Sequence, residues 1–196
     1  MSVKRAIIGF KGLALAPVTT NTAESYVTSV GFALLHVGKM SHTVKESKQD
    51  LYYDDDLYAQ PRNVSGEDVE TTVAEVPLDQ LEDMGLGVLD TTTNTLEADF
   101  SPAAKEYAMR WIADTVDGKP SYFNYRVFEL TGISYGNFAS RADNATVCEV
   151  TIKGVFKKPL LASLKPWAVM QLKDDGSNQA ACTAFLTAAE TKPATP

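Results

Sequence analysis

The feature that most constrains the fold is the short period of the apolar pattern. Along 66–76, Val69, Thr71 and Val73 alternate with Glu70 and other neighbours, and a period of two separates the two faces of a β-strand. Short apolar runs bounded by turn-forming residues recur along the chain and favour β structure over a helical bundle. With 196 residues, the chain is long enough to bury its own core. We expect one mainly β domain over 1–173.

The alternating runs define a series of expected strands joined by turns. The Asp117–Gly118 pair before an aromatic run is a hairpin signal, and Lys157, Lys158 and Pro159 close the last clear strand. Beyond 173 the chain becomes rich in Ala and Thr, so we expect 174–196 to be a loosely ordered C-terminal extension. The expected strands cover 7–18, 32–37, 41–53, 66–76, 101–117, 122–128 and 146–156.

Two of these strands form an expected long hairpin over about 41–76. Its first strand ends in Leu51, Tyr52 and Tyr53, and its connection runs through Pro61 and Arg62. Pro77 then occupies the first turn of a short helix over about 77–86, because proline is tolerated where a helix begins. We expect this helix to cover an open end or face of the sheet.

Residues 101–117 carry signals for both a helix and a strand. Ser101 followed by Pro102 is a good helix start, and Tyr107 and Trp111 have helical spacing. Yet Tyr107, Met109 and Trp111 also alternate with their neighbours, as residues of a strand do. We choose the strand.

The charges are divided unequally along the chain, whose net charge is −7. Residues 54–106 hold fourteen Asp or Glu against only Arg62 and Lys105, whereas 107–173 hold nine Lys or Arg against five acids. The acidic excess argues against a site that grips nucleic acid, because such sites neutralise phosphates with clustered cations. One interpretation is solvated loops on one side of the domain. The other is that the two patches face each other between copies, since a head-to-tail interface joins two different surfaces.

The residues needed for catalysis do not form a recognisable pattern. His36 and His42 are the two histidines, and neither is accompanied by the GxSxG turn of a serine hydrolase or spaced as in a zinc protease. No phosphate-cradling glycine loop follows Gly9 and Gly12. We expect no catalytic residue and no cofactor.

A metal site is not expected either. Asp54, Asp55 and Asp56 lack the alternating ligands and closing Glu of a calcium loop, so a solvated turn or an interface patch is preferred. Cys148 and Cys182 form no CxxC pair, and Cys148 lies in an alternating run as a small core residue. Lys11 interrupts the N-terminal apolar run, so we expect no signal peptide. No run is long enough to insert in a membrane.

With these segments in order, the chain resembles the major tail protein family of long-tailed, siphovirus-type bacteriophages and prophages. The likeness covers roughly the first five-sixths of the chain, and the order of the elements carries it. Leu51, Tyr52, Tyr53, Asp54 and Asp55 look like the family's Leu-Tyr-x-Asp-Asp turn in the long hairpin. The other segments that carry the likeness are IIGFKGLALAPV, VETTVAEVPLDQLEDMGLG, EYAMRWIADTVDGKPSYFNYRVFEL and the strand that ends at Phe156.

The resemblance implies a tail-tube-type β-sandwich with a long hairpin and a short flanking α-helix. Six copies would form a ring, and rings would stack head to tail into a hollow tube through which DNA passes without specific binding. By analogy the hairpin reaches a neighbouring ring. The candidate site for stacking between rings is therefore Leu51, Tyr52, Tyr53, Asp54, Asp55 and Asp56. Such tubes have an acidic lumen, and a negative wall repels the phosphate backbone.

The resemblance also implies partners and a location. The partners are other copies of the chain and the tape measure, tail terminator and distal tail proteins, and the location is the virion tail, assembled in the host cytoplasm. Residues 132–145 and the chain after Pro159 do not align with the family. Two alternatives remain: a phage decoration or carbohydrate-binding β-sandwich module, which needs an exposed aromatic platform, and a small hydrolase built on His36 or His42.

Overall fold

The computed structural model describes residues 7, 9–48, 51–53, 56–59, 62–98, 105–136 and 149–193. Two short helices, α1 (Leu78–Asp83) and α2 (Gln179–Ala184), accompany the strands, and neither is long and apolar enough to span a bilayer. The strands are β1 (Lys11–Asn21), β2 (Ser25–Thr28), β3 (Phe32–Lys48), β4 (Leu51–Tyr53), β5 (Asp56–Ala59), β6 (Arg62–Glu75), β7 (Gly87–Asp90), β8 (Thr95–Ala98), β9 (Glu106–Ala113), β10 (Ser121–Tyr135), β11 (Val150–Lys157), β12 (Trp167–Gln171) and β13 (Thr191–Pro193).

Six antiparallel strands close on themselves to form the body of the molecule. β1 pairs with β3, β3 with β6, β6 with β11, β11 with β10, β10 with β9, and β9 again with β1. Each of these strands pairs with two others, but β3 pairs with β1 only over Phe32–Leu34, so its edge beyond Leu34 faces no other strand of the described residues. β12 and β2 extend the sheet from β10 and β1, and β13 pairs with β2. The expected mainly β sandwich with a flanking helix is confirmed.

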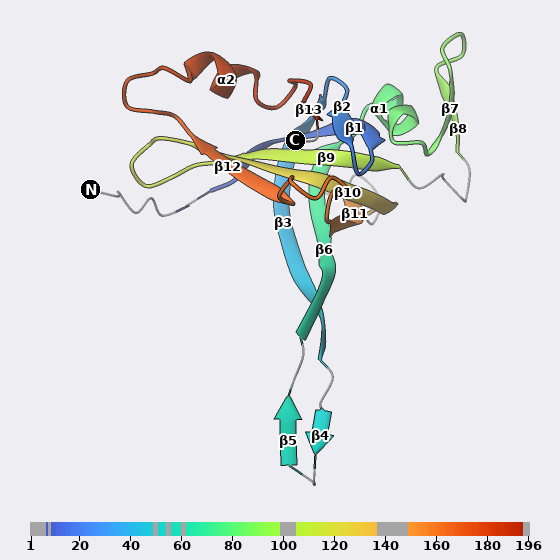
Figure 1. Cartoon of the computed structure of the whole chain (residues 1–196). Coiled ribbons are helices and arrows are strands. Elements are labelled where there is room, and N and C mark those ends of the chain that lie inside the picture. Colours follow the sequence, from blue (N-terminus) through green and yellow to red (C-terminus); the bar gives the residue numbers. More distant parts are fainter. Residues whose placement is uncertain are drawn as a thin grey trace, which may run out of the picture.

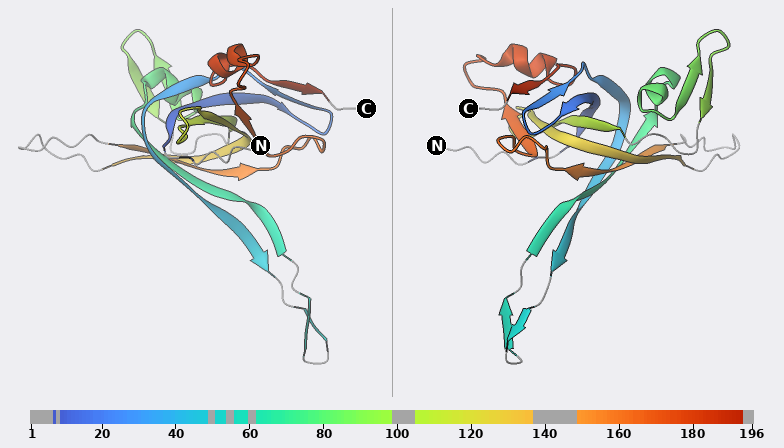
Figure 2. Two further views of the ribbon diagram at one scale, coloured as in Figure 1. Left: turned by 90° about the vertical axis from the view of Figure 1, so that its left-hand side faces the viewer. Right: turned by 45° about the vertical axis from the view of Figure 1, so that its right-hand side comes forward.

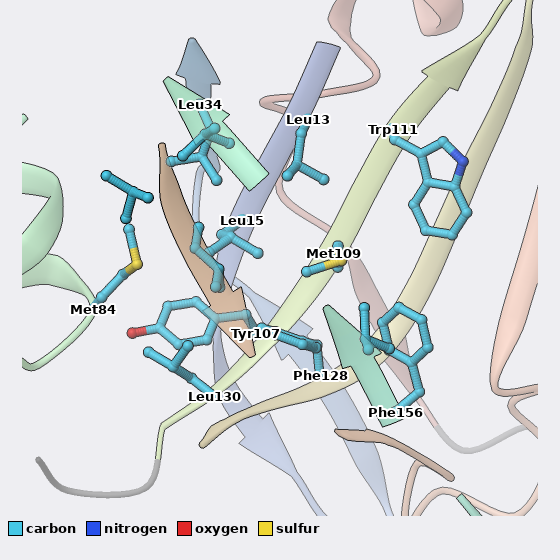
Figure 3. Packing of buried hydrophobic residues seen from close by; sticks show 14 residues of the cluster. Leu13, Leu15, Leu34, Met84, Tyr107, Met109, Trp111, Phe128, Leu130 and Phe156 are labelled. Atoms are coloured by element: carbon cyan, nitrogen blue, oxygen red, sulfur yellow. The ribbon is translucent and has the colours of Figure 1, made fainter. Parts of the chain in front are cut away.

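The core lies inside this closed set of strands (Figure 3). Inward positions alternate with outward ones because successive strand side chains point to opposite faces. Thus Leu13 and Leu15 of β1 are fully buried, as are Met109 of β9 and Phe128 of β10. Trp111 stacks on Phe123, with ring centroids 5.2 Å apart. The aromatic run around 122–128 therefore supplies core and cross-strand pairs, as the sequence indicated.

The long hairpin is present and projects from the body as an arm (Figures 1 and 2). We define the arm as the part of β3 and β6 beyond the pairing with β11, together with β4 and β5. Instead of two expected strands, β3 runs unbroken from Phe32 to Lys48, and its pairing with β6 shifts register between Val37 and Met40. The sequence predicted a break between two strands here, but the structure has a register shift within one continuous strand.

The remaining expectations are met with shifted boundaries. The first strand begins at Lys11, and only a single bridge joins Ile7 to Thr115. The flanking helix follows Pro77 as expected but is shorter than predicted. The ambiguous segment is strand β9, although 101–104 lie outside the described residues. The last predicted strand is β11 from Val150, and Cys148 is also outside the described residues.

The extension after 173 corrects the sequence expectation as far as 193. Its described residues form α2 and β13 and cover the outward face of β9, β10 and β12 (Figure 1). Phe185 packs edge-on against Tyr122, and Cys182 is buried. Composition suggested a loose tail because small residues carry little hydrophobic signal, but here their size lets the segment lie close to the sheet. Residues 194–196 lie outside the described part.

Candidate interaction site

The stem, where the arm meets the body over 41–46 of β3 and the facing part of β6, carries polar cross-strand pairs; β6 is still paired with β11 there at Glu67 and Asp68. His42 Nδ1 of β3 lies 2.9 Å from Glu67 Oε2 of β6, and Lys45 Nζ lies 2.7 Å from Asp68 Oδ1. The side chains over 41–46 are all exposed, and Val44 is 42% exposed. A two-stranded ribbon by itself is only marginally stable in water. The side chains of the β3 strand of the stem are therefore open to solvent.

The structure places the predicted stacking site at the far end of this arm. β4 and β5 pair through Leu51 with Ala59 and Tyr53 with Asp56, and Figure 2 shows this hairpin well beyond the body. Asp54 and Asp55 lie outside the described residues. Four of the six predicted residues, Leu51, Tyr52, Tyr53 and Asp56, are therefore at the arm's tip, where no catalytic cleft surrounds them in the described part of the chain.

The acidic segment maps to the arm's base and to one end of the body. Asp68 and Glu70 lie on β6, and Asp79 and Asp83 lie on α1, all with exposed side chains. The β7–β8 hairpin beside α1 carries Asp90 and Glu97, also exposed. The acids of α1 and the β7–β8 hairpin lie at the upper right of Figure 1, whereas Asp68 and Glu70 lie on β6, which runs from the body into the downward arm.

The basic segment is divided between the interior and the surface. Arg110 and Arg126 are buried, which the charge pattern alone did not indicate. Lys119, Lys153 and Lys157 pair with Asp174, Glu70 and Glu129 of the same chain. Lys158, Lys165 and Lys173 are exposed. The basic surface available to another molecule is therefore smaller than the sequence suggested, and part of it surrounds the β11–β12 connection.

Glu190 explains why the two arginines can be buried. Its Oε1 accepts a hydrogen bond from Arg126 Nε at 3.2 Å, and its Oε2 lies 3.8 Å from Arg110 Nη2 and accepts from Asn124 Nδ2 at 2.8 Å. Burial lowers the pKa of Arg110, and the Glu190 carboxylate opposes that shift. The Glu190 amide also donates to Thr28 Oγ1 at 2.9 Å. This carboxylate is thus the anchor of the C-terminal segment.

Sequence reasoning missed this anchor, although a signal for it exists. Arg110 and Arg126 stand in strands whose neighbours are apolar, and a buried cation requires a carboxylate partner. Glu190 is the one acidic residue in the Ala-rich stretch that follows Gly176. A search for the missing partner of the two arginines would have indicated an ordered C-terminal segment.

An aromatic cleft opens at the base of the arm and was also missed. It has a volume of about 120 Å³, and its floor and walls combine rings with charged side chains. Tyr125 and Phe156 stack with centroids 4.0 Å apart, and Trp167 of β12 continues the series 6.3 Å from Tyr125. Trp167 is 51% exposed. The cleft is lined by Gly66, Glu67, Tyr125, Phe156, Lys157, Lys158, Pro166 and Trp167.

Electrostatics inside the cleft are largely balanced, but its rim is basic. Tyr125 hydrogen-bonds to Glu67, and burial together with that carboxylate raises the pKa of Tyr125. Glu67 is also held by His42, and Lys157 binds Glu129. Lys158 makes no ion pair with another described residue. The cleft thus offers a hydrophobic hollow with a cation at its edge.

The histidines and the acids do not assemble into a recognisable reactive centre. His36 is exposed and has a positive φ of 51°, and His42 is the exposed partner of Glu67. Within the ranges that the structure describes, no three His, Cys, Asp or Glu side chains are grouped to hold a metal ion.

Comparison with known proteins gives a structural likeness. No family model matches the chain, and no curated protein matches it. Among solved structures, the chain is similar to a chain of the cryo-EM structure of the anti-feeding prophage baseplate, 6-fold symmetrised. The TM-score is 0.45 and the sequence identity is 10%, over 88% of this chain and 99% of that chain. A likeness of this degree identifies no family for the chain.

Proposed function

We propose that the protein is a structural subunit of a bacteriophage tail tube and has no enzymatic activity. Copies would form hexameric rings that stack head to tail as a hollow conduit for DNA ejection. The observation that carries the proposal is the arm, whose stem exposes the side chains over 41–46 on a ladder held by His42–Glu67 and Lys45–Asp68. A projecting ribbon without cover from its own body is suited to contact with a neighbouring subunit.

The length of the arm supports stacking of copies along an axis. The residues between Asp56 at the tip and Gly66 at the base reach up to about 33 Å, at about 3.3 Å per residue in extended chain. A compact domain of this length has a radius of gyration of about 16 Å, which corresponds to a diameter of about 40 Å. The arm therefore reaches about one subunit further, as a contact between successive rings requires.

The closed body supports the proposal in a second way. Because each of the six strands of the body pairs with two others, fewer strand edges are left for uncontrolled pairing between bodies. Association is thus directed to the arm and to charged surfaces. The exposed acids of α1 and the β7–β8 hairpin would face a channel that repels the DNA backbone. The tape measure, tail terminator and distal tail proteins are the further partners that this role requires.

Negative-stain electron microscopy of the purified protein tests the proposal. We expect rings at moderate concentration and tubes with an open centre at high concentration, because a weak, repeated head-to-tail contact depends on protein concentration. The salt concentration should be varied over the same series. Monomers that persist at high concentration in every salt would contradict the proposal.

A second candidate is a carbohydrate-binding module, and one observation favours it. Trp167 is half-exposed beside Tyr125 and Phe156, and flat aromatic surfaces are suited to stacking on sugar rings. This candidate requires binding by a monomer. Titration of the protein with soluble oligosaccharides, followed by tryptophan fluorescence, separates the two functions.

A further inference from the structure

We propose that the aromatic cleft at the base of the arm receives the tip of the arm of a second copy. This proposal rests on the proposed function and adds a named receiving surface to it. The tip is the β4–β5 hairpin, and the cleft is the hollow between Tyr125, Phe156 and Trp167.

The geometry of a head-to-tail stack brings these two regions to the same level. In such a stack each subunit is displaced from the next by about its own dimension, which is about 40 Å for a domain of this size. The arm's tip lies up to about 33 Å from its own base. The tip of one copy therefore comes close to the level of the arm's base in the next copy. Gly66 and Glu67, which mark that base, line the cleft.

The size and chemistry of the cleft fit the side chains that the tip carries. An enclosed cavity of about 150 Å³ holds a whole benzene ring, so the cleft, with a volume of about 120 Å³, takes part of one aromatic ring and leaves the rest at its mouth. The tip sequence offers two rings, Tyr52 and Tyr53. Aromatic pairs stabilise a contact beyond the effect of the area they bury. A tyrosine is also amphipathic, so its hydroxyl can stay at the wet rim while part of its ring is buried.

Charge complementarity indicates which way the tip is oriented. The rim of the cleft carries Lys158, and the exposed Lys165 directly precedes the cleft residue Pro166. The tip has three successive Asp residues in its sequence, of which Asp56 is described. Glu67 does not oppose this match strongly, because its carboxylate is engaged by His42 and Tyr125. Asp56 would thus meet the lysines while the ring of one tyrosine of the tip enters the cleft.

Disulfide cross-linking between different copies tests the contact directly. We would prepare Asp56→Cys and Lys165→Cys as separate proteins, each in a Cys148→Ser background, with the buried Cys182 retained. Mixed and oxidised, they should give a cross-linked heterodimer, because a disulfide requires Cα atoms within about 7 Å. A mixture of Asp56→Cys with Val88→Cys is the matched control, since Val88 is exposed on β7 away from the cleft. This control should give at least tenfold less heterodimer.

Removal of the exposed tryptophan gives a second measurement. Trp167→Ala should reduce the amount of tube at least tenfold in the same electron-microscopy series, while Val88→Ala assembles as the wild type does. Trp167 is 51% exposed, so its replacement should leave the melting temperature of the monomer nearly unchanged.

The outcomes separate this proposal from the function on which it rests. Wild-type tubes with no Asp56–Lys165 heterodimer, or with unchanged assembly of Trp167→Ala, would refute the cleft contact and leave the tail-tube proposal standing. A wild type that forms neither rings nor tubes would refute both. Oligosaccharide binding by the monomer that Trp167→Ala abolishes would assign the cleft to a glycan and overturn the contact.

Discussion

The body and the arm are both built from hydrogen-bonded strands, but the side chains of these strands are covered to different extents. In the body, β10 is covered on both faces: Phe128 points into the core, and Asn124 and Arg126 lie under the C-terminal segment. In the arm, the described side chains over 41–46 are exposed, and single cross-strand ion pairs such as Lys45–Asp68 connect the strands. The comparison teaches that one chain covers both faces of β10, whereas the side chains over 41–46 lie open to solvent, as the proposed contact with a second copy requires.

Deletion of the arm is the strongest way to break this comparison. Lys45 and Gly66 are directly paired, so an Asn-Gly turn can replace 46–65, because this pair favours a tight hairpin. We expect complete loss of rings stacked into tubes, with a melting temperature within about 4 °C of the wild type, the shift expected for about 1 kcal/mol in a domain of this size. Electron microscopy and circular dichroism measure the two effects. Tubes formed by the shortened protein would show that the arm does not carry the contact.

Glu190→Ala tests the claim that one chain covers both faces of β10. It leaves Arg110 and Arg126 buried without their carboxylate, and breaking a buried pair costs about 3–5 kcal/mol. At about 2–4 °C per kcal/mol, the melting temperature should fall by about 6–20 °C. Glu24→Ala removes an exposed acid and is the matched control. A shift no larger than that of the control would mean that Glu190 does not anchor the segment.

Gly154→Ala probes the packing between β10 and β11. A Cβ at Gly154 would come within 2.4 Å of both the Glu129 carbonyl oxygen and the Phe128 ring, and overpacking of this kind costs about 1–3 kcal/mol. Gly132→Ala, in the same pair of strands, meets nothing within 4 Å. Denaturant unfolding should therefore show a clearly lower free energy of unfolding for Gly154→Ala. The free energy of unfolding of Gly132→Ala should differ from that of the wild type by less than about 0.5 kcal/mol. Equal effects would contradict the packing described for this ladder.

Neutralisation of the acidic triplet should have the smallest effect, and only on assembly. Replacing Asp54, Asp55 and Asp56 with Asn should slow stacking several-fold, because charge complementarity acts mainly on the rate of association. Assembly of the wild type should also slow as salt rises, given a screening length of about 8 Å near 0.15 M. Light scattering follows both rates. An equal loss of thermal stability in the isolated subunit would instead make the triplet an element of the fold.

The sequence predicted the parts of the fold that local pattern controls. The alternation of Tyr107, Met109 and Trp111 indicated β9 correctly over the competing helical signal, and Pro77 marked the start of α1. The closure of the body could not be predicted, because the pairing of β9 with β1 joins residues far apart in the sequence. The C-terminal segment was misjudged because its anchor is a single ion-pair cluster rather than an apolar run.

The sequence located the tip of the arm but not the cleft that we propose as its receiving surface. Leu51, Tyr52 and Tyr53 lie next to one another in the sequence, so a motif could locate them. The cleft instead joins Gly66 of β6, Tyr125 of β10 and Trp167 of β12. These residues come together only through strand pairing, and no local pattern connects them.

A cryo-electron microscopy reconstruction of the assembled protein tests the central claim most directly. It should show an open channel formed by repeated copies, with each arm seated on the next copy along the axis and its tip at the base of that copy's arm. A reconstruction in which the arms extend into solvent without touching another copy, or in which the assembled protein encloses no channel, would contradict it.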